Sequence, residues 1–389
     1  MCDILKHTAI KTGDKTMKKI HRTLSLFTVA AMCTALLCSC GEAPDSSQTD
    51  SSSKAATTTT ADTTADTTTT GEASSTASAT SAPDSSVSDS SSAVTDDTKT
   101  NGITPAMWKV TSPEGNTMVM LGSFHALKDE CYPLPEAVTN AYNNADILAV
   151  ECDITSTSED GEYMKNLMKQ MLYNDNTKLS QHISEEAYSA LQTYLGYWGM
   201  DISALEVYRP WAVSSTLDTL LIQDSDFDTE KGLDNFLLTT AHADGKEIYE
   251  VESVDFQMNM LINFSDDIYD LMFRSYEGET KESQKQALED LYTAWKSGDI
   301  ETFLEEDNEE ELAGYTEEDK KIAEDYNNQM LYDRNKNMAK AAEDLMSQGK
   351  NVFYVVGAAH YAGEGGIIDL LEKDGYTAER VQYLSLIHI

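Results

Sequence analysis

Apolar residues in this chain form short runs near both ends of the region 101–389 and helical patterns between them. The runs at 116–121 and 351–356 are each followed directly by a Gly-x-x-His sequence, at 122–125 and 357–360. Short apolar runs bounded by glycine are typical of buried strands. We therefore predict two related structural units, each beginning with a strand, at the two ends of this region.

The segments that follow the two Gly-x-x-His sequences repeat one pattern. After the first, residues 135–144 carry apolar positions at helical spacing, and the apolar run 147–150 predicts a strand that ends at Glu151. After the second, residues 366–373 predict a helix and residues 377–381 a strand. Each half is therefore expected to consist of a strand, a Gly-x-x-His loop, a helix and a second strand.

The middle of the region, residues 156–349, is predicted to be mainly helical. Apolar residues recur at helical spacing in runs such as 187–195 and 288–295. One short run, 247–251, follows an Asp-Gly turn and predicts a strand that ends at Glu252. The expected fold is α/β or α+β, with a mixed sheet built from the two halves and a large helical insertion.

The first forty residues have the pattern of an export signal. A basic stretch at 17–22 precedes an apolar run at 24–37, and Leu-Cys-Ser-Cys then ends at Cys40. The run is short for a membrane span, and the ending is that of a bacterial lipoprotein signal peptide with a lipidated Cys40. We expect a lipid-anchored protein on the extracytoplasmic side of the cell membrane. An ordinary cleaved signal and an uncleaved anchor are the alternatives.

Residues 41–100 differ in composition from the rest of the chain. Serine, threonine, alanine and aspartate predominate, and aromatic or branched aliphatic residues are scarce. Such a segment cannot bury enough apolar surface to offset the entropy of ordering it. We predict a disordered stalk, whose relaxed length is on the order of 40 Å, between the anchor and one domain at 101–389.

The predicted domain is strongly acidic. The chain carries a net charge of −39, of which +4 lies in residues 1–40 and −8 in residues 41–100, leaving −35 on residues 101–389. A charge of this sign disfavours nucleic acids and anionic lipid head groups as partners. Contact with a membrane is therefore expected through the lipid anchor only.

Only two cysteines lie in the predicted domain, Cys131 and Cys152. In an exported protein they could form a disulfide, but two separate buried thiols fit the sequence equally well. The sequence leaves both alternatives open.

Three titratable residues lie directly after predicted strands: His125, Glu151 and His360. If those strands are parallel neighbours, these side chains converge, because loops at the carboxyl ends of parallel strands meet in one crevice. Two imidazoles and a carboxylate suit a hydrolytic zinc, manganese or cobalt ion that activates water. The alternative is that each histidine is a hydrogen-bonded structural residue. Glu252 adds another carboxylate at the end of a predicted strand.

Beyond these patterns, the region from about residue 108 to 381 resembles the TraB/PrgY/GumN family, which includes the TIKI-type membrane metalloproteases. The resemblance rests on short motifs that follow one another along nearly the whole domain. They are Gly-Ser-Phe-His at 122–125, Glu151, Arg-Pro-Trp at 209–211, Gly-Leu-Asp at 232–234, Gly-Lys at 245–246, Glu252, Gln257, Trp295, Gly-Asp at 298–299, Arg-Asn at 334–335, Gly-Ala-Ala-His at 357–360, Gly363 and Gly-Tyr at 375–376. One departure is Val251, where the family usually has leucine before the glutamate.

The resemblance implies a metal-dependent hydrolase, and a peptidase in particular. Carried over position by position, it makes His125, Glu151 and His360 the expected metal-site residues. The expected partners are a peptide or small-molecule substrate and a divalent metal ion. A non-catalytic protein that sequesters a peptide signal or another small ligand is the main alternative, and a purely structural surface protein is a third.

The resemblance also suggests roles for three further residues. Glu252 is a candidate second carboxylate, either a further metal ligand or the general base that takes a proton from water. Its alternative is a solvated acid at a strand end. Arg334 could stabilise an oxyanion or orient a carboxylate, and Asn335 could donate a hydrogen bond. A salt bridge on a helix face is the alternative for Arg334.

Overall fold

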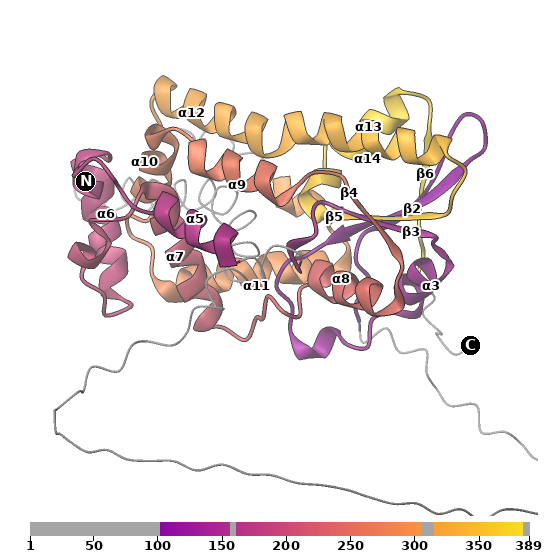
Figure 1. Cartoon of the computed structure of the whole chain (residues 1–389), viewed down its shortest axis with the longest axis horizontal. Helices are drawn as coiled ribbons and strands as arrows, with labels where there is room; N and C mark the ends of the chain where they lie inside the picture. The colour runs from indigo at the N-terminus through magenta and orange to yellow at the C-terminus, as the bar shows by residue number, and fades with distance from the viewer. Residues whose placement is uncertain (1–101, 156–160, 305–314, 384–389) are drawn as a thin grey trace, which may run out of the picture. The chain divides into compact units, whose positions relative to one another are not determined.

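The computed structural model describes residues 102–155, 161–304 and 315–383 (Figure 1). The predicted signal peptide with Cys40 and the predicted stalk lie outside these ranges. No helix within them is both long and apolar enough to cross a membrane.

Six strands of the described part of the chain form one mixed sheet. They are β1 (Met107–Thr111), β2 (Thr117–Ser123), β3 (Ile147–Val150), β4 (Glu247–Glu250), β5 (Val352–Gly357) and β6 (Thr377–Arg380). The strand order is β4-β3-β5-β2-β1-β6. Neighbours from β4 to β2 are parallel, whereas β1 is antiparallel to both β2 and β6. The expected parallel arrangement of the strands at 116–121, 147–150 and 351–356 is confirmed.

The two halves have the predicted order of elements. In the first half, β2 is followed by the short 3₁₀ helix η1 (Asp129–Cys131), by α3 (Glu136–Asn144) and by β3. In the second half, β5 is followed by the 3₁₀ helix η7 (Ala358–Tyr361), by α14 (Ile367–Lys373) and by β6. The second half differs in one respect, because β6 joins the sheet at its far edge, beside β1.

The strand β1 was not predicted from the sequence. It is short, and its side chains do not alternate cleanly between buried and exposed positions. A tight turn joins it to β2, in which Gly115 has a φ of +92° and the backbone N–H of Asn116 donates to Ser112 Oγ. The hairpin places β1 beside β2, where it also pairs with β6.

The predicted helical insertion is present between β3 and β5. Its α-helices are α5 (Gly161–Gln170), α6 (Glu185–Gly196), α7 (Pro210–Gln223), α8 (Leu233–Asp244), α9 (Val254–Asn263), α10 (Asp266–Arg274), α11 (Lys281–Ser297), α12 (Glu317–Asn327) and α13 (Asp333–Ser347). The described part of the insertion also contains the 3₁₀ helices η2 (Leu179–Gln181), η3 (Ile202–Leu205) and η4 (Glu301–Leu304). The only strand in the described part of the insertion is β4, at the predicted position.

Several helix boundaries follow local sequence signals. The hydroxyls of Ser253 and Thr280 accept hydrogen bonds from backbone N–H groups in the first turns of α9 and α11. Helices α8 and α11 end at Gly245 and Gly298, which adopt the left-handed conformation with φ values of 66° and 75°. One segment departs from regular α-helix, because a π-helical turn, η6 (Asn328–Tyr332), joins α12 to α13.

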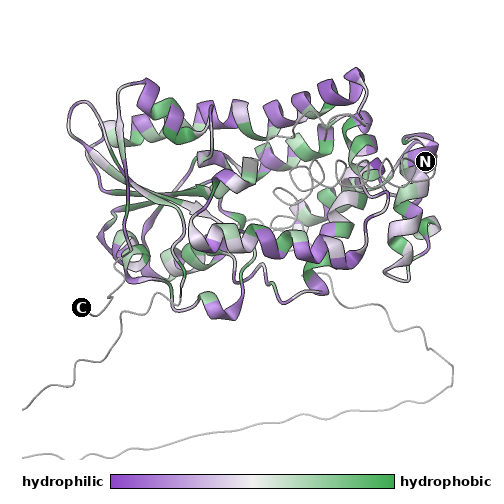
Figure 2. Ribbon diagram, turned by 180° about the vertical axis from the view of Figure 1, so that it is seen from behind, coloured by the Kyte–Doolittle hydropathy of each residue, from purple (hydrophilic) through white to green (hydrophobic). Residues whose placement is uncertain are grey.

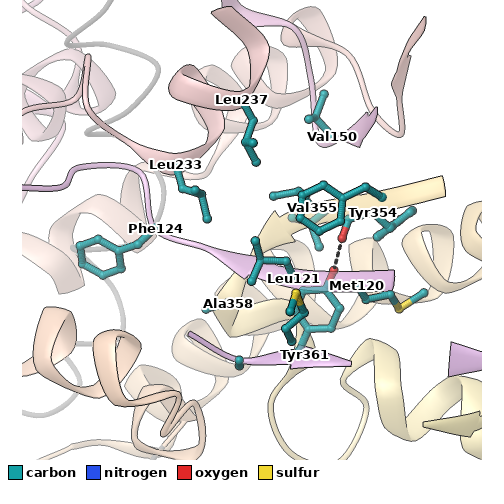
Figure 3. Close-up of a cluster of buried hydrophobic side chains, with 14 of the residues drawn as sticks. Met120, Leu121, Phe124, Val150, Leu233, Leu237, Tyr354, Val355, Ala358 and Tyr361 are labelled. Carbon is teal, nitrogen blue, oxygen red and sulfur yellow. Dashed lines mark hydrogen bonds between the residues drawn. The ribbon is translucent and has the colours of Figure 1, made fainter. Parts of the chain in front are cut away.

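The main hydrophobic core packs against the sheet. It includes Leu121 of β2, Tyr354 and Val355 of β5, and Leu233 and Leu237 of α8 (Figure 3). The central strands β3 and β5 consist almost entirely of buried hydrophobic residues, whereas the edge strands β4 and β6 and the helices carry hydrophilic residues as well (Figure 2). This burial fixes the carboxyl ends of β2, β3 and β5 relative to one another.

The two cysteines of the domain are free and buried. Cys131 Sγ lies 3.1 Å from the hydroxyl of Tyr292, and Cys152 Sγ lies 3.5 Å from Oε1 of Gln257. Of the two alternatives that the sequence left open, the structure therefore has two separate buried thiols.

A second hydrophobic core lies among the helices of the insertion, and it contains an unusual carboxylate. Asp218 of α7 is 5% exposed, and its Oδ2 has no hydrogen-bond partner among the described residues. Leu217 beside it belongs to this core. Burial raises the pKa of Asp218 well above its usual value, because a charged carboxylate is poorly solvated there.

Replacing Asp218 by asparagine is expected to stabilise the protein increasingly as the pH rises. The folded state holds a proton on Asp218 that the unfolded state releases above pH 4, so this group lowers the free energy of unfolding as the pH rises toward its folded pKa. The free energy of unfolding of Asp218→Asn, relative to that of the wild type, should grow by about 1.4 kcal/mol per pH unit in that range. Urea titrations between pH 4 and pH 8 measure it, and Asp374→Asn at an exposed position is the control. A difference that does not change with pH would contradict the assignment.

Candidate functional site

Three of the predicted site residues meet at the carboxyl end of β5, around Gly357. A Cβ atom added to Gly357 would lie 3.1 Å from Oε1 of Glu151, 3.6 Å from Nε2 of His125 and 3.6 Å from Cδ2 of His360. The side chains are largely buried, with exposed fractions of 27% for His125, 12% for Glu151 and 6% for His360. The structure thus brings together residues that follow β2, β3 and β5, and we call this cluster the centre.

His125 is held by the first turn of α8. Its Nδ1 lies 2.8 Å from Oδ2 of Asp234, so Nε2 is the ring nitrogen that faces the centre. The start of α8 approaches closely, since a Cβ on Gly232 would lie 2.1 Å from the carbonyl oxygen of His125. Burial lowers the pKa of His125, but the charge and hydrogen bond of Asp234 outweigh this and raise it to about 9.

His360 is held by α13. Its Nδ1 lies 2.6 Å from Oδ1 of Asn335, whose Nδ2 donates to the carbonyl oxygen of Gly365 at 2.9 Å. Because the amide nitrogen is used by Gly365, the amide oxygen accepts the Nδ1 proton and Nε2 keeps its lone pair. Burial and the nearby positive charge of Arg334 lower the pKa of His360 to about 3, so the ring is neutral.

Glu151 is surrounded by hydrogen-bond donors. Oε2 accepts from Nη2 of Arg334 at 2.7 Å and from Nε2 of Gln257 at 2.9 Å. Oε1 accepts from the backbone N–H of Gly357 at 2.7 Å and lies 3.8 Å from Nε2 of His360. Burial raises the pKa of Glu151, but the charge of Arg334 outweighs it and holds the pKa well below its usual range. Glu151 is therefore ionised.

Glu252 is bound on both oxygens. Oε1 accepts from Nε of Arg334 at 2.8 Å, and Oε2 accepts from Nη2 of Arg334 at 2.8 Å and from Gln257 at 2.7 Å. Arg334 and Glu252 thus form a two-pronged ion pair, and their side chains are each 5% exposed. Nη1 of Arg334 donates to the carbonyl oxygen of Met330 within η6. This ion pair is buried, unlike the surface salt bridge considered from the sequence.

Two residues of this site were given no role from the sequence. Asp234 orients His125 from the first turn of α8, and Gln257 bridges the two glutamates from α9. The local signals for them are weak: an aspartate in the first turn of a helix, and a glutamine little more than one helical turn after Glu252. Neither signal indicates which distant side chain the residue contacts.

The residues of the centre fit a divalent metal ion in the type of donor atom that they offer. Two Nε2 atoms and one carboxylate oxygen are ligands that zinc, manganese and cobalt accept. Both Nδ1 atoms contact an acceptor oxygen of another side chain, as is usual for metal-ligating histidines. Within the described ranges, no three His, Cys, Asp or Glu side chains are already arranged to hold a metal ion. Binding would therefore need adjustment of these side chains.

Comparisons with known proteins show which proteins this chain is similar to. The model of the TraB/PrgY/gumN family matches residues 106–380. The chain is 26% identical over 157 residues to the uncharacterized protein YbaP of Escherichia coli, covering 40% of this chain and 56% of YbaP. It is 25% identical over 293 residues to a metalloprotease TIKI homolog of Nematostella vectensis, covering 64% and 61%. With metalloprotease TIKI2 of Danio rerio, identity is 25% over 164 residues, covering 38% and 32%.

These similarities do not extend over whole proteins. The chain spans about three-fifths or less of the length of each of these relatives. No solved structure matches the chain.

Removing the charge of Arg334 is expected to destabilise the fold strongly. Arg334→Met would leave the buried carboxylates of Glu151 and Glu252 without their cation, and breaking a buried pair in this way costs about 3–5 kcal/mol. The free energy of unfolding from urea titration at pH 7 measures the loss. Arg274→Met is the control, because Arg274 also pairs with two carboxylates, those of Asp270 and Asp319, but its side chain is 30% exposed, compared with 5% for Arg334. A similar loss in both variants would contradict the special role of Arg334.

Proposed function

We propose, on the premise that this chain belongs to the TraB/PrgY/gumN family, that it is a metal-dependent hydrolase, and more specifically a peptidase. The observation that carries the proposal is the convergence of His125, Glu151 and His360 around Gly357. The relatives that are named metalloproteases support the same chemistry.

The side chains of the centre have distinct tasks in this proposal. Nε2 of His125, Nε2 of His360 and a carboxylate oxygen of Glu151 would hold a zinc, manganese or cobalt ion. When bound, such an ion supplies Lewis-acid activation of a water molecule at neutral pH. Asp234 and Asn335 keep the two imidazoles in the tautomer that presents Nε2. His125 has to lose its Nε2 proton when it becomes a ligand, so binding would release a proton.

Arg334 and Asn335 act mainly through other residues in this arrangement. Arg334 orients Glu151 and keeps it ionised, which is one of the two roles expected from the sequence. Asn335 accepts from His360 and donates to Gly365, so its hydrogen bonds position the ring and the following loop. Glu252 could serve as a general base only if Arg334 releases one of its oxygens.

The proposed location follows from the sequence pattern at Cys40. A lipidated Cys40 and a stalk at 41–100 would hold the domain outside the cytoplasm, where its substrates would be extracytoplasmic peptides. The lipid would then be the only contact with the membrane.

A second candidate function is the capture of a peptide or small ligand without turnover. The observation that favours it is the complete pairing of Glu252, whose two oxygens are bound by Arg334 and Gln257. A centre without a free carboxylate base beside it could bind a ligand and leave it intact.

Metal binding and peptide cleavage are expected to depend on both histidines. With the whole chain purified in detergent, His125→Ala and His360→Ala should each weaken zinc or manganese binding at least about 100-fold and abolish cleavage of a peptide library. His182→Ala is the matched control, because His182 pairs with Asp266 in the insertion. Calorimetry measures binding, and mass spectrometry measures cleavage with and without chelator.

The outcomes separate the two candidate functions. Cleavage that survives chelation and both substitutions would exclude the metal mechanism. Metal binding by the wild-type protein without cleavage of any peptide would favour ligand capture.

Asp234 is expected to contribute to metal affinity without touching the metal. Asp234→Asn removes the charge that makes His125 a better donor, and loss of such a partner typically lowers metal affinity about 10- to 100-fold. Calorimetry with manganese and zinc measures the change. Asp266→Asn is the matched control, because it alters an equivalent histidine–aspartate pair at His182. Equal affinities in wild type and Asp234→Asn would show that the contact is only structural.

A further inference from the structure

One edge of the sheet offers backbone groups to which no described strand is paired. β4 is the last strand in the order β4-β3-β5-β2-β1-β6, and among the described residues it pairs with β3 alone. Three of its four residues are exposed: Glu247, Tyr249 and Glu250. The aromatic side chain of Tyr249 is 37% exposed. An exposed edge strand of this kind is a template for pairing with another extended chain.

The pairing with β3 shows which backbone groups of β4 face outward. Val150 of β3 is the register partner of Glu250, and the N–H of Val251 donates to the carbonyl oxygen of Val150 at 2.9 Å. In a parallel pair, alternate residues direct both their N–H and their C=O toward the neighbouring strand. Tyr249 and Val251 therefore face β3. Ile248 and Glu250 direct their backbone groups away from the sheet, where no backbone group of the described ranges bonds to them.

This outward edge leads toward the centre. Glu252 follows β4 by two residues and binds Arg334 and Gln257, which also bind Glu151. Phe256, in the first turn of the following helix α9, is 45% exposed. The strand β5, which ends at the centre, would be the third neighbour of a strand added to β4, so the two would lie about 14 Å apart. Four or five extended residues span that distance.

The side chains of β4 restrict what can pair with it. Glu247 and Glu250 form the two ends of the strand, and apolar side chains lie between them. Glu247 also pairs with Lys350, but its side chain remains 57% exposed. A second copy of this chain, paired antiparallel through the same edge, would bring the glutamates opposite each other, which is destabilising. An extended peptide with apolar residues between basic ends is complementary to this strand.

We propose that the outward edge of β4 binds an extended peptide with basic ends, which joins the sheet as a further strand. The inference rests on the proposed function in taking a peptide as the ligand, and both candidate functions, cleavage and capture, include one. It needs no metal ion at the centre. Backbone hydrogen bonds to Ile248 and Glu250 supply affinity in this mode of binding, and the side chains supply specificity.

The first test leaves the protein unchanged and alters the peptide. The probe is a fluorescein-labelled Lys-Val-Thr-Val-Lys peptide amide, and fluorescence anisotropy measures its binding to the whole chain in detergent without added metal. Five further peptides each carry one N-methyl group, which removes one backbone donor. Because a paired strand points alternate N–H groups toward its neighbour, N-methylation should weaken binding about tenfold at alternate positions and little between them. Equal effects at all positions, or no binding of the probe, would overturn the proposal.

The second test removes the outward N–H of Glu250. Glu250→Pro lacks this donor, and proline is tolerated on edge strands. Glu250→Ala is the matched control, because it keeps the N–H but loses the carboxylate and its hydrogen bond from the N–H of Asp153. We expect Glu250→Pro to bind the probe about tenfold more weakly than Glu250→Ala. Equal affinities in two variants with wild-type melting temperatures would contradict a role for this edge.

A proline at the other edge of the sheet controls for the substitution itself. Ala378 of β6 faces away from β1, because the N–H of Val381, three residues later, donates to Met107. Ala378→Pro should therefore bind the probe as the wild type does. Equal weakening by Ala378→Pro and Glu250→Pro would mean that the effect is not specific to β4.

Peptide binding and peptide cleavage are measured separately, so failure of the two proposals would look different. A probe that binds with the alternating pattern but is never cleaved, alone or with zinc or manganese, would contradict the peptidase and support binding at β4. Metal-dependent cleavage of a peptide library without the alternating pattern would leave the hydrolase in place and overturn the binding edge.

Discussion

The buried ion pair between Arg334 and the two glutamates connects the two parts of the domain. Arg334 comes from α13 of the insertion, whereas Glu151 and Glu252 follow adjacent strands of the sheet. The fold must hold all three together, because any one left unpaired in this environment would carry an uncompensated charge. Gln257 completes the network through hydrogen bonds to both carboxylates. The ionised state of Glu151, and with it the chemistry of the centre, depends on this contact.

The two histidines of the centre differ in electrostatic environment although they occur in similar motifs. His125 contacts a carboxylate and has a raised pKa, whereas His360 contacts an amide and has a lowered one. His125 is also the more exposed of the two. The two similar motifs therefore place one histidine with a raised pKa and one with a lowered pKa at the two strand ends. A metal ion would displace a proton from His125, but His360 is already neutral.

Much of this arrangement could be predicted from the sequence, because it depends on local patterns. The apolar runs before both Gly-x-x-His sequences indicated β2 and β5, and the strand ends placed His125, Glu151 and His360 together. The partners of those residues could not be predicted in the same way. Asp234 contacts a histidine 109 residues away, and this contact depends on how α8 packs against the sheet. Arg334 and Glu151 are 183 residues apart in the sequence. The sequence therefore did not decide whether Arg334 forms a salt bridge on a helix surface or orients a carboxylate in the site.

The π-helical turn η6 allows one continuous helical segment, formed by α12, η6 and α13, to pack against both hydrophobic cores. It carries one more residue per turn than an α-helix would, which rotates every later side chain about the axis. Before the turn, α12 packs against α10 of the insertion, and after it, α13 packs against α14 and β5. The change of helical phase lets the buried face of the helix switch from one core to the other without an intervening loop. Arg334 and Asn335 lie directly after this switch, where a single-residue deletion would turn both away from the sheet.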